Sequence, residues 1–162
     1  MKLGMVGLGK MGANMTARLL AAGHHLVVFD RNPDAVRMSV EKGALASGSL
    51  SDLVSKLETP RVVWVMVPAG EVTESVIEEL SPFLEEGDVV VDGGNSNYKD
   101  SMRRAATLKE TGVAFVDVGT SGGVWGLTEG YSLMVGGEKD SVDPLRPVRF
   151  TFSSAARGNG KR

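Results

Sequence analysis

The chain has 162 residues, of which 42% are hydrophobic and 23% are charged, an ordinary composition for one globular domain. It contains no cysteine and only two histidines, so we exclude disulfides and expect no metal site. The net charge is −2, although the last 18 residues carry five basic side chains and no acidic one. No apolar run is long enough to span a membrane, and we expect a cytoplasmic protein that binds neither membranes nor nucleic acid.

Residues 2–12 combine a strand pattern with a glycine-rich turn. Residues 2–6 form an apolar run typical of a buried strand, and a helical pattern follows from Met11 to about Ala22. The turn between them has the form G-x-G-x-x-G and consists of Gly7, Leu8, Gly9, Lys10, Met11 and Gly12. Glycines at these positions let a pyrophosphate approach the backbone, and the helix N-terminus attracts its charge. The order of strand, turn and helix therefore predicts a dinucleotide-binding site.

The second predicted strand, residues 26–29, ends at Asp30. An acid at this place accepts hydrogen bonds from the adenosine ribose hydroxyls and repels the 2′-phosphate of NADP. Arg31 could attract that phosphate, or could equally be a solvated turn residue. We therefore expect NAD or NADP as the cofactor, with Asp30 favouring NAD.

Strand and helix patterns alternate through the rest of the chain. Apolar runs predict further strands at residues 45–46, 62–67, 89–92, 113–117 and 131–137. This alternation predicts an α/β fold with a doubly wound, Rossmann-like parallel sheet, with Trp64 in its core. Ligands of such sheets bind beyond the carboxyl ends of the strands. We therefore expect the site to be formed by the loops at residues 7–12, 30–32, 67–70, 93–97 and 118–126.

Four motifs occur in the order seen in 6-phosphogluconate dehydrogenases, which belong to the β-hydroxyacid dehydrogenase superfamily. They are the glycine turn and the segments Val67–Gly70, Asp92–Ser96 and Asp117–Gly123, and together they resemble the short bacterial type of the enzyme. The resemblance extends over about residues 1–147. It implies a reaction of the pentose phosphate pathway, in which 6-phosphogluconate is oxidised by hydride transfer to NAD(P) and decarboxylated to ribulose 5-phosphate.

The resemblance also implies roles for individual residues. The implied cofactor-binding residues are Gly7, Leu8, Gly9, Lys10, Met11, Gly12, Asp30, Arg31, Asn32, Val67, Pro68, Ala69 and Asn95. The implied substrate-binding residues are Asn95, Ser121, Gly122 and Gly123. Asn95 offers a donor and an acceptor, and the N–H groups of Gly122 and Gly123 could receive a carboxylate. Taken alone, residues 121–123 are also consistent with a flexible turn.

Members of the family continue into an all-helical domain, which supplies a lysine base, a glutamate acid and most of the interface of the homo-oligomer. No residue here matches that domain, so we assign no catalytic residue and expect little or no dehydrogenase activity from this chain alone. Residues 1–147 are predicted to form the dinucleotide-binding domain. Residues 148–162 are predicted to be a disordered basic tail, because they show no amphipathic period. The abrupt change resembles a frameshift or a premature stop.

Two other functions are compatible with these motifs. The chain could belong to another β-hydroxyacid dehydrogenase that acts on a different small acid. It could also be a non-catalytic dinucleotide-binding module with a partner of its own. The segment Gly93–Ser96 favours the 6-phosphogluconate dehydrogenase interpretation over another β-hydroxyacid dehydrogenase, and the non-catalytic module stays an open alternative.

Overall fold

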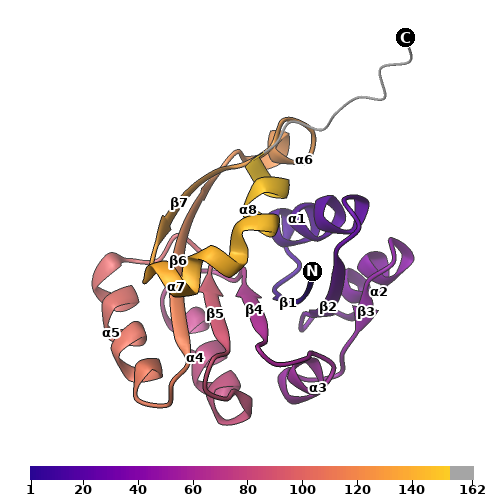
Figure 1. The fold of residues 1–162 in the computed structure, drawn as a ribbon. Coiled ribbons are helices and arrows are strands. Elements are labelled where there is room, and N and C mark those ends of the chain that lie inside the picture. The colour runs from indigo at the N-terminus through magenta and orange to yellow at the C-terminus, as the bar shows by residue number, and fades with distance from the viewer. Residues whose placement is uncertain (154–162) are drawn as a thin grey trace.

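The computed structural model describes residues 1–153, apart from the side chain of Val124. These residues form a seven-stranded sheet with the strand order β3-β2-β1-β4-β5-β6-β7 (Figure 1). The strands are β1 (Lys2–Val6), β2 (His25–Phe29), β3 (Leu45–Ala46), β4 (Val62–Val65), β5 (Val89–Asp92), β6 (Ala114–Ser121) and β7 (Ser132–Gly136). Strands β1 to β6 pair in parallel, whereas β7 is antiparallel to β6. The predicted Rossmann-like sheet is confirmed, with one antiparallel strand added at its end.

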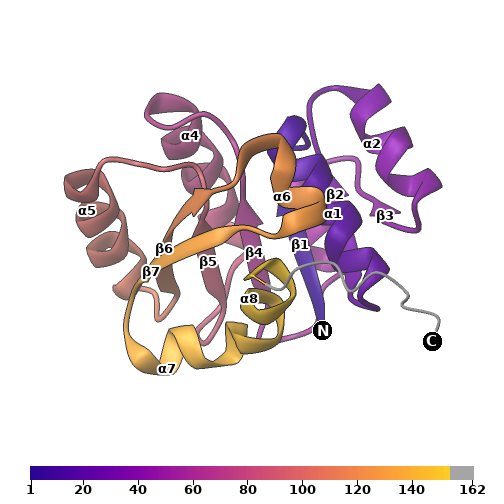
Figure 2. The same ribbon diagram turned by 90° about the horizontal axis from the view of Figure 1, so that it is seen from above.

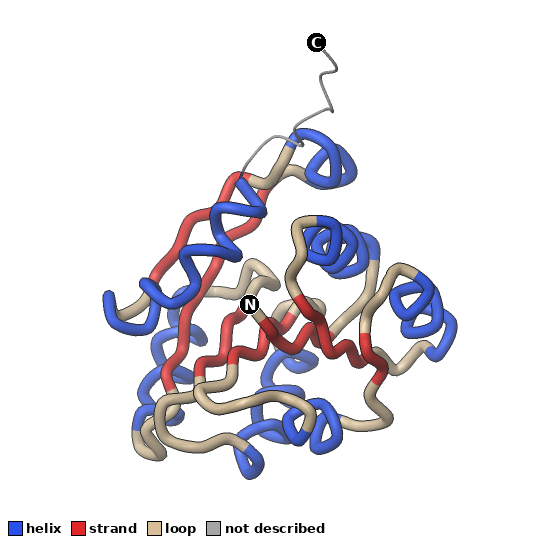
Figure 3. Tube along the Cα trace, turned by 45° about the vertical axis from the view of Figure 1, so that its right-hand side comes forward, coloured by secondary structure: helices blue, strands red, loops and turns tan. Residues whose placement is uncertain are grey.

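Helices cover both faces of this sheet (Figures 2 and 3). One face is covered by α1 (Lys10–Ala21), α2 (Pro33–Glu41), α7 (Lys139–Val142) and α8 (Arg146–Ser153). The other face is covered by α3 (Leu50–Ser55), α4 (Glu71–Leu80) and α5 (Tyr98–Lys109). The connection between β6 and β7 contains the short helix α6 (Gly126–Glu129), and three 3₁₀ turns occur at η1 (Ser81–Phe83), η2 (Gly123–Trp125) and η3 (Asp143–Leu145). Within residues 1–153, no helix is long and apolar enough to cross a membrane.

Several helices begin at a side chain that accepts a hydrogen bond from the first turn. Asn32 accepts from the N–H of Asp34 at the start of α2, and Asn97 accepts from the N–H of Lys99 at the start of α5. Such caps satisfy backbone donors that have no partner inside the helix. The caps therefore place the start of each helix directly after the loop that follows a strand.

The core consists of two apolar clusters, one on each face of the sheet. Because side chains alternate along a strand, Trp64 points to the α1 and α8 side, while Val63 and Val65 point to the α3 and α4 side. All four residues of β4 are buried, as expected for a parallel strand covered on both faces. The prediction that Trp64 lies in the core is confirmed, since its side chain has no exposed surface.

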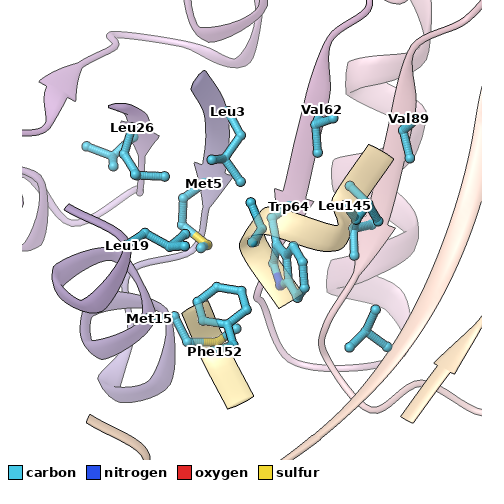
Figure 4. Packing of buried hydrophobic residues seen from close by; sticks show 14 of the residues in the cluster. Leu3, Met5, Met15, Leu19, Leu26, Val62, Trp64, Val89, Leu145 and Phe152 are labelled. Carbon is cyan, nitrogen blue, oxygen red and sulfur yellow. The ribbon is translucent and has the colours of Figure 1, made fainter. Parts of the chain in front are cut away.

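The segment expected to be disordered from residue 148 begins with a helix. Val148 and Phe152 lie four residues apart on α8 and are fully buried. The ring of Phe152 meets that of Trp64 edge to face, with 5.1 Å between their centroids (Figure 4). The prediction of disorder is therefore wrong for residues 148–153. Their three apolar residues, Val148, Phe150 and Phe152, occur at every second position and so show no helical period. The rest of the predicted tail, residues 154–162, lies outside the described residues.

Strand β6 is also longer than its sequence pattern indicates. Residues 118–121 were expected in a loop, but they continue the strand and pair with β7 in a regular register from Asp117–Gly136 to Ser121–Ser132. The small and polar residues Gly119, Thr120 and Ser121 conceal the strand in the sequence, because their backbone pairing depends on the distant β7.

Candidate cofactor site

The glycine turn closes tightly between β1 and α1. Gly7 has a φ of 94°, which favours glycine, and its N–H donates to the carbonyl of Phe29 at 2.9 Å. A Cβ on Gly12 would collide with the carbonyl oxygen of Gly7, so the helix can approach the turn only if this residue is glycine. A Cβ on Gly9 would have no heavy atom within 4 Å. The turn is therefore packed at both ends and open at Gly9, where the N-terminus of α1 presents its N–H groups.

The Asp30 carboxylate connects the glycine turn to the following loop. Its Oδ2 accepts a 2.6 Å hydrogen bond from the N–H of Leu8, and its Oδ1 accepts a 2.7 Å hydrogen bond from the N–H of Asn32. Arg31 is exposed, and the side chain of Asn32 serves as the cap of α2. The geometry thus brings a fixed negative charge to the ends of β1 and β2, with lone pairs remaining on both oxygens.

A pocket of about 180 Å³ joins three of the predicted loops, and it is smaller than the roughly 300–1,000 Å³ of most small-molecule sites. Its lining consists of Gly9, Lys10, Met11, Gly12, Met66, Val67, Gly93, Gly94 and Asn95. Val67 lies beside the glycine turn, whereas Pro68 and Ala69 are exposed and are not part of this lining. The pocket is lined mainly by backbone and apolar side chains, with Lys10 and Asn95 as its long polar groups.

Asn95 makes a pair of hydrogen bonds with one residue of β6. Its Oδ1 accepts from the N–H of Thr120 at 3.0 Å, and its Nδ2 donates to the carbonyl of Thr120 at 3.3 Å. Asn95 also has a φ of 57°, in the left-handed region that asparagine tolerates better than most residues. The side chain therefore fastens the loop at residues 93–97 to β6, and one amide hydrogen remains available to a ligand.

The segment Ser121–Gly123 lies directly after this attachment point. Ser121 is the last residue of β6, and the carbonyl of Gly122 accepts hydrogen bonds from the N–H groups of Trp125 and Gly126, each at 3.1 Å. These residues do not line the pocket at Gly9–Gly12. The structure thus connects Ser121–Gly123 to Asn95 through Thr120 and places them beyond the pocket itself.

Two buried arginines that sequence analysis passed over organise this region. Arg18 of α1 donates to the carbonyl of Leu127 at 2.9 Å and to that of Thr151 at 2.7 Å, which joins α1 to α6 and α8. Arg104 of α5 makes a second network, described below. The sequence contained a sign of this burial, because both arginines lie on the apolar face of their helix. Arg18 is on the same face as Met11 and Met15, and Arg104 is four residues before Leu108.

Comparison with known proteins assigns this fold and glycine turn to a family. Residues 2–157 match the family described as the NAD binding domain of 6-phosphogluconate dehydrogenase. The chain belongs to this family. The match continues past residue 147, so the prediction that the resemblance ends there is wrong.

Individual relatives agree with this assignment. The NAD(+)-dependent, decarboxylating 6-phosphogluconate dehydrogenase of Haloferax volcanii is 42% identical over 160 residues, which are 99% of this chain and 52% of that protein. The Plasmodium falciparum 6-phosphogluconate dehydrogenase, solved in apo form, with NADP+ and with 6-phosphogluconate, is 29% identical with a TM-score of 0.86, over 98% of this chain and 35% of that chain.

A related dehydrogenase has a similar fold. The 3-hydroxyisobutyrate dehydrogenase of Mycobacterium tuberculosis is 28% identical with a TM-score of 0.87, over 95% of this chain and 52% of that chain. The chain therefore spans about half the length of the Haloferax and Mycobacterium proteins. The shared part is the NAD-binding domain.

Proposed function

We propose that this chain binds NAD as the cofactor portion of a decarboxylating 6-phosphogluconate dehydrogenase. The observation that carries the proposal is the Asp30 carboxylate, which is held by the N–H groups of Leu8 and Asn32 beside the open face of Gly9. This arrangement fits a dinucleotide, since the pyrophosphate meets free N–H groups and the adenosine ribose meets a fixed acceptor. When bound, the nicotinamide accepts a hydride from the substrate.

The same carboxylate supports a preference for NAD over NADP. A 2′-phosphate on the adenosine ribose would meet the negative charge of Asp30, whose position is fixed by two hydrogen bonds. Arg31 is exposed, and it is the one residue of this loop that could offset that repulsion. The relative at 42% identity is NAD(+)-dependent by name, in agreement with this preference.

For the substrate side, we propose that Asn95 and Ser121–Gly123 bind 6-phosphogluconate. Thr120 connects Asn95 to this segment, so a ligand at the remaining amide hydrogen of Asn95 would lie close to the end of β6. A Cβ on Gly123 would have no heavy atom of the described residues within 4 Å, which leaves room for a carboxylate at this position. The relatives named 6-phosphogluconate dehydrogenase favour this substrate over that of 3-hydroxyisobutyrate dehydrogenase, because they are more similar in sequence.

The cofactor proposal is tested by Asp30→Asn, which removes the charge and keeps the size of the side chain. We expect the Kd for NAD to rise roughly tenfold, since a hydrogen bond to a charged group contributes about 1.5–3 kcal/mol. The Kd for NADP should stay the same or fall, because the repulsion of the 2′-phosphate is removed. Both constants are measured by isothermal titration calorimetry, with the Tm of each chain recorded.

Asp34→Asn is the matched control, because Asp34 lies four residues further on, is exposed and pairs with Arg37 at 3.2 Å. It should leave both dissociation constants within about twofold, the range expected for a surface substitution. Absence of NAD binding by the unchanged chain, or equal NAD affinity in the Asp30→Asn chain, would contradict the proposed function.

A further inference from the structure

Arg104 is a buried side chain whose guanidinium group reaches four partners. Only 2% of it is exposed, and its Nε donates to Oε2 of Glu74 at 2.7 Å. Its Nη2 donates to the carbonyl of Gly70 at 3.3 Å. Its Nη1 lies 3.2 Å from Oγ of Ser96 and 3.4 Å from Oδ2 of Asp92. One side chain of α5 therefore contacts the end of β5, the start of α4 and the two loops that follow β4 and β5.

The two loops that Arg104 joins also pack against each other. A Cβ on Gly94 would lie 2.6 Å from the carbonyl oxygen of Val67, so the loops meet at backbone distance. Asp92 holds the second loop from inside, since its Oδ1 accepts from the N–H of Gly94 at 2.9 Å and its Oδ2 accepts from Oγ of Ser96 at 2.5 Å. Arg104 compensates the buried charge of Asp92 and fixes this loop relative to the one at residues 67–70.

The adenosine side of the proposed site is separate from this network. The contacts of Asp30 are made with Leu8 and Asn32. Gly7 and Gly12 pack against Met66, and Gly7 also packs against the side chain of Val67 at the start of the loop at residues 67–70. None of the hydrogen bonds of Arg104 that are described above involves these residues. A change at Arg104 should therefore act on one end of the dinucleotide.

We propose that Arg104 is a positioning residue that holds the loops at residues 67–70 and 93–97 in register for the nicotinamide end of NAD. The inference rests on the proposed function and deepens it. The pocket next to the glycine turn is lined by Val67 of the first loop and by Gly93, Gly94 and Asn95 of the second. Arg104 binds Gly70 in the first loop and Ser96 in the second. Loss of the guanidinium leaves the Asp92 carboxylate buried without its cation, and the two loops lose their common donor.

The test compares two ligands on the whole 162-residue chain. In the Arg104→Lys chain, which keeps the charge but cannot make all four contacts, we expect a three- to tenfold rise in the Kd for NAD. The Kd for ADP, which has the adenosine and the two phosphates but lacks the nicotinamide riboside, should change less than twofold. Arg104→Met, without any donor, should give a larger loss for NAD and again little for ADP. Both constants are measured by calorimetry.

Arg103→Met is the matched control. Arg103 binds the same Glu74, at 2.8 Å from each oxygen, but it is 54% exposed and also pairs with Asp100 at 3.5 Å. The control loses the Glu74 contact without touching either loop, so it should bind NAD and ADP as the unchanged chain does. Equal loss for both ligands at Arg104, unchanged NAD affinity there, or the same selective loss in the control would overturn the inference.

A second measurement does not depend on ligand binding or on the Met variant folding. Amide hydrogen exchange in the unliganded Arg104→Lys chain should become faster at residues 67–70 and 93–97, and should stay unchanged at residues 7–12. Uniform acceleration across these segments would indicate a purely structural role and overturn the inference. If the unchanged chain binds neither NAD nor ADP, the proposed function fails, and the exchange experiment still decides whether Arg104 holds the loops.

Discussion

At the scale of single residues, Glu74 shows how a charge network fixes an ionisation state. Its carboxylate accepts two hydrogen bonds from Arg103 and one from Arg104. The bonds from Arg103 are the largest cause that lowers the pKa of Glu74 from 4.5 to about 2, and those from Arg104 add to it. Because this pKa lies below its unfolded value, Glu74 stabilises the folded state above about pH 4.5. That contribution is lost as the pH falls towards 2.

We therefore expect Glu74→Gln to lower the free energy of unfolding by about 1–2 kcal/mol near neutral pH, an amount already reduced for the partial exposure of the side chain. The difference from the unchanged chain should shrink below pH 4.5 and approach zero near pH 2, where Glu74 itself becomes protonated. Tm measured against pH by calorimetry checks this. Glu78→Gln, an exposed change on the same helix, should show no comparable pH dependence.

Sequence could predict the position of Asp30 but not the partner of Asn95. Asp30 follows the second strand at the distance typical of the dinucleotide-binding turn, so its place at the sheet edge follows from chain order alone. Asn95 binds the backbone of Thr120, 25 residues away, and that pairing depends on β5 and β6 being neighbours. A side-chain contact between two loops becomes visible only once the strand order is known.

At the scale of elements, α8 is the clearest departure from the sequence pattern. Its two buried residues face a surface already made by β4 and β7, where Phe152 lies against Trp64 and, with 6.2 Å between ring centroids, against Tyr131. Arg18 fixes the end of the helix, because its Nε donates a hydrogen bond to the carbonyl of Thr151. The helix is therefore stabilised by tertiary contacts, which cannot be predicted from its own eight residues.

Phe152→Ala should lower the free energy of unfolding by about 3–5 kcal/mol, because it empties a buried aromatic site at the centre of the α1 and α8 face. Urea denaturation monitored by circular dichroism measures this change. Met102→Ala is the control, since that side chain lies on α5 and is 68% exposed. It should change the stability by less than about 0.5 kcal/mol. Equal stability of the Phe152→Ala chain would show that α8 does not pack in solution as described.

At the scale of the whole molecule, the lining of the pocket beside the glycine turn bears on whether this chain could move a proton. Oxidation of a hydroxyl needs a base close to the reacting oxygen. The pocket beside the glycine turn offers mainly backbone, apolar side chains and the amide of Asn95, and its one cation, Lys10, belongs to the turn itself. This lining agrees with the expectation from sequence that this chain alone turns over little substrate, which stays a prediction.

We expect the 162-residue chain to bind NAD yet to form little or no NADH with 6-phosphogluconate. The measurement is the appearance of NADH by absorbance, at cofactor and substrate concentrations that saturate the Haloferax relative assayed in parallel. At 100 times its Kd, NAD should add about 2.7 kcal/mol to the free energy of unfolding, and the Tm of this chain should rise accordingly. Robust turnover by this chain would contradict the prediction.

The sequence by itself determined the alternation of strands and helices, the glycine turn, the place of Asp30 and the family. These are local features, because apolar periods and a turn between a strand and a helix are encoded within about twenty residues. Only the tertiary structure decided that α8 exists, that β6 continues to Ser121 and that Arg104 joins two loops. The packing of α8 and the reach of Arg104 to Gly70 depend on side chains that are far apart in the chain, and only the folded sheet brings them together. The continuation of β6 depends on backbone pairing with β7, which the small and polar residues 119–121 do not indicate.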